Sequence, residues 1–114
     1  MRKTIITLLL ATVSMPAASA ITGNEWLAFE SGDDIEKLYA LGYFQGVMET
    51  QFAVGMLGLC IDKPENATHG QAQKIVIKWM NENPSETHTA AITIFFSALS
   101  DAWGVRRTDE RGFC

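Results

Sequence analysis

Side chains that could carry out catalysis or hold a metal are few in this chain of 114 residues, and they lie far apart. The two histidines, His69 and His88, each stand at an expected helix start, where the positive end of the helix dipole disfavours a charged imidazole. Their separation does not match the His-x-x-x-His spacing that brings two ligands to one helix face. The sequence contains neither a Gly-x-Ser-x-Gly motif nor a glycine-rich phosphate loop. We therefore expect no enzyme activity, no metal site and no cofactor.

Cys60 and Cys114 are the remaining reactive side chains, and they favour a structural disulfide over a redox site. They lack a Cys-x-x-Cys spacing and a nearby activating base. A bond between them would close a loop of about 55 residues and contribute roughly 4 kcal/mol to the free energy of unfolding on the chain-entropy model. It would also hold the tail, residues 105–113. A bond between two chains is the alternative.

The N-terminus has the three parts of a secretory signal peptide. Arg2 and Lys3 form a basic start, residues 5–13 are largely apolar, and Ala18-Ser19-Ala20 supplies small residues at a cleavage site. The apolar stretch is too short to span a bilayer core of ~30 Å. We expect residues 1–20 to be removed, leaving residues 21–114 as a single exported domain without a stable membrane anchor.

The expected mature chain is acidic, with seven Lys and Arg against thirteen Asp and Glu, a formal net charge of −6. Such a charge disfavours nucleic acid or anionic membrane as a partner and favours a basic protein. Simple solubility is the alternative, and it accounts for the charge of most acidic proteins.

Apolar periodicity and capping residues predict helices throughout the body of the chain, and no segment alternates as a strand would. We expect an all-α fold, a compact bundle or orthogonal array of about four helices joined by one disulfide. The four helices are expected to start at Asn24, at Asp33 or Asp34, at Thr68 with Gln71 as its capping-box partner, and at Asn83 followed by Pro84. The last helix is expected to end at Gly104.

The same periodicity predicts which side chains face the core. In the second helix, Gly42 and Gly46 lie four residues apart and would let a neighbouring helix approach closely. The tryptophans are expected to be core residues, whereas the apolar cluster around Phe52 suits either core filling or a partner surface. The expected inward positions are Ile35, Leu38, Tyr39, Gly42, Tyr43, Gly46, Val47 and Thr50 in the second helix, Ile75, Val76, Trp79 and Met80 in the third, and Ala91, Ile92, Phe95, Phe96, Leu99 and Trp103 in the last. The tryptophans are Trp26, Trp79 and Trp103, and the Phe52 cluster includes Met48, Met56, Leu57 and Leu59.

Several of these local motifs also occur together in one known family. The chain resembles the Rap/Tai family of small periplasmic immunity proteins, which neutralise peptidoglycan amidases delivered by type VI secretion. The resemblance covers roughly residues 23–103. It rests on Gly42, Tyr43, Gly46 and Val47, then Cys60 and Ile61, then Thr68, Gly70 and Gln71, then Ile75 and Val76, then Asn83 and Pro84, with His88 where the family tends to carry a histidine.

The resemblance implies an all-helical, periplasmic protein that acts as a homodimer and occludes the active site of a cognate amidase. No chemistry is required of such an inhibitor. We expect the loop before the third helix to contact the enzyme through Asp62, Glu65, Asn66 and His69; an ordinary solvated turn is the alternative for this loop. The chain departs from the family pattern at Ala40-Leu41, where many relatives carry a cysteine, and in its longer tail.

A second function class fits the same size and export signal. A small periplasmic acid-stress chaperone, which binds unfolded proteins, would use its carboxylates and histidines to gain positive charge at low pH and expose the apolar stretch from Met48 to Leu59. That function predicts that the isolated protein suppresses aggregation in acid, as measured by light scattering.

Overall fold

Four α-helices and a small two-stranded sheet make up the computed structural model, which describes residues 20–114. The predicted signal peptide lies outside the described residues, apart from Ala20. The all-α prediction is confirmed. The elements are α1 (Gly23–Glu30), α2 (Asp34–Val54), β1 (Leu59–Ile61), α3 (His69–Glu82), a 3₁₀ turn η1 (Pro84–Glu86), α4 (Ala91–Trp103) and β2 (Val105–Arg107).

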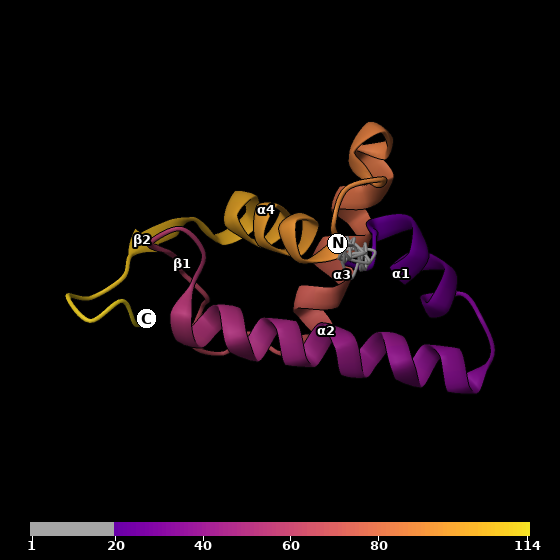
Figure 1. Cartoon of the computed structure of the whole chain (residues 1–114), viewed down its shortest axis with the longest axis horizontal. Coiled ribbons are helices and arrows are strands. Elements are labelled where there is room, and N and C mark those ends of the chain that lie inside the picture. The colour runs from indigo at the N-terminus through magenta and orange to yellow at the C-terminus, as the bar shows by residue number, and fades with distance from the viewer. Residues whose placement is uncertain (1–19) are drawn as a thin grey trace, which may run out of the picture.

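The helices form a crossed array. The C-terminal ends of α2 and α4 both lie at the end of the molecule that carries β1 and β2, whereas α3 runs steeply across them (Figure 1). Among the residues that the structure describes, no helix is both long and apolar enough to cross a membrane.

Local side-chain contacts set the start of three helices. In each, the capping side chain accepts a hydrogen bond from the amide three residues on, and the residue there bonds back to the cap amide. Thr22, and not the predicted Asn24, caps α1, because only Thr22 has a glutamate in the reciprocal position. The pairs are Thr22 with Glu25, Asp33 with Glu36, and Thr68 with Gln71.

Trp26 lies at the centre of the core. Its side chain is 0% exposed, and its ring centroid lies 5.0 Å from that of Phe95 and 5.7 Å from that of Phe44. The indole nitrogen donates a hydrogen bond to the carbonyl oxygen of Ala40 at 3.0 Å, so the buried polar atom is satisfied. Trp26 thereby joins α1, α2 and α4.

The inward face of α2 differs from the prediction. Ile35 is 80% exposed and Leu38 is 69% exposed, and a Cβ atom at Gly42 or Gly46 would meet nothing within 4 Å. The predicted close approach of a helix at these glycines is therefore wrong for the single chain. Tyr43 and Val47 are half-buried against the core, as predicted. The fully buried positions of α2 are Ala40, Phe44, Met48 and Gln51, which follow three- and four-residue steps on another side of the helix.

The start of α4 is also later than predicted. Asn83 and Pro84 begin only the 3₁₀ turn η1, and the α-helix starts at Ala91. The intervening segment pairs with the beginning of the described chain: the Gly23 amide donates to the Thr89 carbonyl at 2.9 Å, and the Ala91 amide donates to the Ile21 carbonyl at 2.8 Å. Residues 87–89 form turns, with the Thr89 amide donating to the Glu86 carbonyl at 3.1 Å, and Ala90 forms an isolated antiparallel bridge with Thr22, so His88 lies between η1 and α4 and not in α4.

The tail folds back onto the middle of the chain. β2 pairs antiparallel with β1, with Cys60 opposite Arg106, and a disulfide joins Cys60 to Cys114 within the chain. The sheet was not predicted, because each strand has only three residues and the pairing joins distant segments. The predicted disulfide is present, and it fixes the tail beside the C-terminal end of α2, where the Cys114 amide donates to the Ala53 carbonyl at 2.8 Å.

Candidate functional site

The loop between β1 and α3, residues 62–68, is held at both of its ends. At its start, the Asp62 amide donates to the Gly104 carbonyl at 2.9 Å, next to the sheet and the disulfide. At its end, Thr68 caps α3. Within the loop, the Ala67 amide donates to the Pro64 carbonyl at 3.0 Å. Its shape is therefore fixed by backbone bonds, which lowers the entropy lost when a partner binds.

The four predicted contact residues do not form one cluster. Asp62, Glu65 and Asn66 are exposed, and His69 is half-buried as the first residue of α3. Asp62 lies 3.8 Å from the guanidinium of Arg106 in an exposed ion pair, which is worth little to stability. Asn66 and His69 line two different hollows on either side of the loop.

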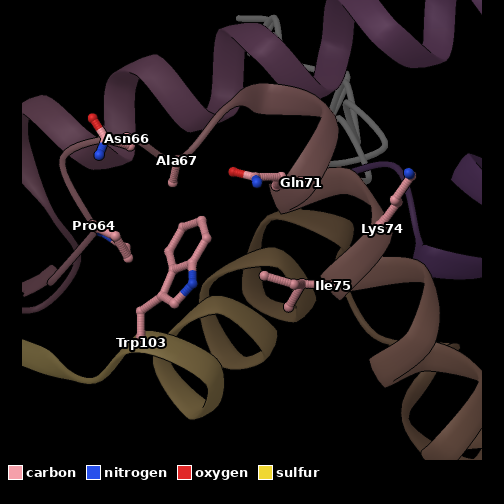
Figure 2. Close-up of a pocket in the computed structure, with 7 residues that line it drawn as sticks. All are labelled: Pro64, Asn66, Ala67, Gln71, Lys74, Ile75 and Trp103. Atoms are coloured by element: carbon pink, nitrogen blue, oxygen red, sulfur yellow. The ribbon is translucent and has the colours of Figure 1, made fainter.

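The larger hollow has a volume of about 490 Å³ and opens between the loop, α3 and the end of α4. Figure 2 shows the indole of Trp103 in its middle, pointing toward Ala67, with Ile75 beside it. The polar groups at its edge come from Asn66, Gln71 and Lys74. An apolar floor with an amide and ammonium rim suits an apolar or aromatic side chain of a partner protein.

The smaller hollow, of about 180 Å³, is lined partly by Phe52 and His69. Lys63 bridges it: its ammonium lies 5.5 Å from the centroid of the Phe52 ring and donates to the Ala67 carbonyl at 3.4 Å. This cation–π contact ties the loop to α2. Lys63 therefore acts as a support of the loop.

Trp103 was predicted as a core residue, and the structure places it half-buried in the wall of the larger hollow. Gly104, which ends α4, was the available signal, because the last side chain of a helix is seldom enclosed on all sides. Trp79 is likewise half-buried, and its indole nitrogen donates to the Asp101 carboxylate at 2.9 Å. Trp26 is fully buried, as predicted, and Trp79 and Trp103 pack against the edge of the core.

Within residues 20–114, no three His, Cys, Asp or Glu side chains gather in a way that could hold a metal ion.

Comparison with known proteins agrees with the resemblance of the sequence. A family model described as Rap1a immunity proteins matches residues 22–104, which include all four helices, the loop and Trp103. No curated protein and no solved structure matches the chain. On the strength of this match over most of its length, the chain belongs to the Rap1a family of immunity proteins.

Proposed function

We propose that this protein is a periplasmic immunity protein that binds a type VI-secreted peptidoglycan amidase and occludes its active site. Membership of the Rap1a family supports immunity as the function and an effector protein as the partner. The observation that carries the finer proposal is the fixed polar loop 62–68 beside the open apolar hollow around Trp103.

The chemistry of the loop fits an enzyme cleft. Asp62 and Glu65 offer carboxylate acceptors, and Asn66 offers both a donor and an acceptor, all exposed to solvent. A cleft that presents polar catalytic groups would bond to these side chains, while the Trp103 hollow takes an apolar side chain from the cleft rim. A standard interface of about 1,600 Å² in total would exclude substrate.

Two further features support this setting. A signal peptide at residues 1–20 would deliver the domain of residues 21–114 to the periplasm, where disulfides such as Cys60–Cys114 persist. A homodimer would cover the exposed apolar side chains of the first half of α2, namely Ile35, Leu38 and Tyr39.

Coexpression with a periplasm-directed amidase encoded by the neighbouring reading frame tests the function. We expect the full-length protein to prevent lysis, and the same protein without residues 1–20 to fail. Continued lysis in the presence of folded, exported protein would count against this amidase as the target. Suppression of aggregation by the isolated protein at low pH would then favour the acid-stress chaperone.

The double variant Glu65→Ala/Asn66→Ala tests the contact surface. We expect amidase binding to weaken about 10-fold or more, which corresponds to about 1.4 kcal/mol. The melting temperature should stay within about 2 °C, because neither side chain is buried. Asn81→Ala/Glu82→Ala is a matched control: it removes the same two groups, both exposed, at the far end of α3. Equal binding by both double variants would show that the loop is an ordinary solvated turn.

A further inference from the structure

A tight hairpin turn between α2 and β1 carries the most exposed large apolar side chain of the described residues. Met56 and Leu59 pair through two backbone hydrogen bonds of 2.9 Å, and the turn between them consists of Leu57 and Gly58. The Leu57 side chain is 98% exposed. The φ angles of Leu57 and Gly58 are 53° and 79°, so both central residues of the turn are left-handed, as in a type I′ hairpin.

Leucine is a poor choice for this position. The first central residue of a type I′ turn is usually Asn, Asp or Gly, because a Cβ-bearing apolar residue is strained at positive φ. Leu57 is the one non-glycine residue with positive φ in the part of the chain that the structure describes. Since its side chain is almost wholly exposed, no packing within the chain offsets this strain. Asparagine there would suit both the turn and the solvent better.

Hydrogen bonds and a disulfide also fix the position of this turn. The Thr108 amide donates to the Gly58 carbonyl at 3.0 Å. The buried side chain of Gln51 donates through Nε2 to the Met56 sulfur at 3.1 Å and to the Ile92 carbonyl at 3.0 Å. The Cys60–Cys114 disulfide lies directly after the turn. Leu57 is therefore presented in a fixed direction, and a partner that binds it orders little further backbone.

The surroundings of Leu57 indicate what its partner looks like. A shallow hollow of about 520 Å³ beside it is lined also by Leu59, Arg107 and Thr108. Leu59 and Arg107 are register partners, so their side chains stand on the same face of the sheet. Arg107 is exposed and forms no ion pair with any described residue. A complementary surface would offer an apolar recess with a carboxylate at its edge.

We infer that Leu57 is an apolar anchor that inserts into a recess on the effector protein, next to the contact made by loop 62–68. This inference rests on the proposed function. β1 connects the two sites directly, and the five residues from Leu57 to Asp62 span at most about 17 Å. One partner's share of a standard interface, about 800 Å² or ~28 Å across, is wide enough to span this distance. Strain at the turn is retained because the effector buries the side chain.

The test compares Leu57→Asn with Leu57→Met in binding to the purified amidase of the neighbouring reading frame. We expect Leu57→Asn to raise the melting temperature by about 4 °C, because Asn tolerates the left-handed turn. The same variant should bind about 10-fold or more weakly, as is usual when a buried apolar anchor is removed. Leu57→Met keeps the apolar volume and the strain, so its affinity should stay within about threefold of wild type.

The possible results distinguish a failure of the Leu57 anchor from a failure of the proposed immunity function. If the wild-type protein binds the amidase and Leu57→Asn binds it with the same affinity, the anchor is overturned. The proposed immunity function would be unaffected by that result. A change in self-association without a change in effector affinity would equally overturn it, and would assign Leu57 to contact with a second copy. If the wild-type protein did not bind the amidase at all, this amidase would not be its target, and both the anchor on it and the proposed occlusion of it would fail. Stabilisation together with loss of affinity would establish the anchor, because a purely structural residue cannot give both.

Discussion

The indole nitrogen of Trp26 lies 3.0 Å from the carbonyl oxygen of Ala40, and this hydrogen bond lies on the side of α2 that faces the core. Two apolar stripes run along α2 at helical spacing, one through Leu38 and one through Phe44. Trp26 bonds to the backbone on the Phe44 side and packs its ring against Phe44. The other stripe is thereby left exposed.

Replacing Trp26 with Phe should lower the free energy of unfolding by about 2–3 kcal/mol, because it removes the buried hydrogen bond and leaves a small cavity. Urea unfolding followed by circular dichroism measures this change. Trp79→Phe is the control: its bond to Asp101 is exposed, so we expect a loss below about 1 kcal/mol. Similar losses in the two variants would contradict a central role for Trp26.

Removing the disulfide should be the most destabilising change outside the aromatic core. On the chain-entropy model, the double variant Cys60→Ala/Cys114→Ala should lose about 4 kcal/mol, and its melting temperature should fall by about 15 °C or more. Thermal unfolding of this variant, and of the wild type with and without dithiothreitol, measures the effect. Since the double variant has no thiols, dithiothreitol should leave its melting temperature unchanged. An unchanged melting temperature in reduced wild type would mean that the β1–β2 pairing alone holds the tail.

Replacing Gly55 with alanine should lower the stability of the protein, whereas replacing Gly46 with alanine should raise it. Gly55 has a φ of 68°, and a Cβ there would collide with the Leu59 carbonyl, so Gly55→Ala should cost at least about 2 kcal/mol. Gly46 lies inside α2 with open space around it, so Gly46→Ala should gain about 0.5–1 kcal/mol. Thermal unfolding of both variants tests the pair. A loss of stability in Gly46→Ala would indicate that another chain covers this face in solution.

Stability in mild alkali should depend on Tyr43. Burial, and secondarily the neighbouring Tyr39, raise the pKa of the Tyr43 hydroxyl above 10.0. The unfolded chain therefore ionises first as the pH rises, so this group's contribution to stability is complete below about pH 10 and is lost above it. The urea concentration at the unfolding midpoint should fall between about pH 8 and about pH 10.5, and this fall should be smaller in Tyr43→Phe than in wild type. Parallel losses in the two proteins would show that other groups control the alkaline limit.

Local signals allowed much of the helical framework to be predicted. The capping boxes of α2 and α3 and the stop at Gly104 depend on residues within four positions of each other, so the sequence displays them directly. Distant contacts determined the features that were wrong. The start of α4 is delayed by backbone bonds to Ile21 and Gly23, and β1 exists only because β2 pairs with it.

Part of the candidate site could likewise be predicted from the local sequence, and the rest depends on contacts between distant segments. The loop of Asp62, Glu65 and Asn66 could be located from the sequence, because it lies between a cysteine and a helix cap. The hollow beside it could not, since it appears only when the end of α4 brings Trp103 against Ala67. Leu57 was recognised as part of an apolar cluster. Its strained turn became evident only from the backbone angles.

The backbone bonds of Ile21 and Gly23 also limit how far the N-terminus can be shortened without loss of structure. The Ile21 carbonyl accepts from the first residue of α4, and the Gly23 amide donates to Thr89. A protease that cut after Ala20 would leave both bonds intact. Cutting two residues later would remove the acceptor for Ala91 and the Thr22 cap of α1 together. Loss of Ile21 and Thr22 should therefore loosen the junction between α1 and α4, whereas a chain that begins at Ile21 should keep it.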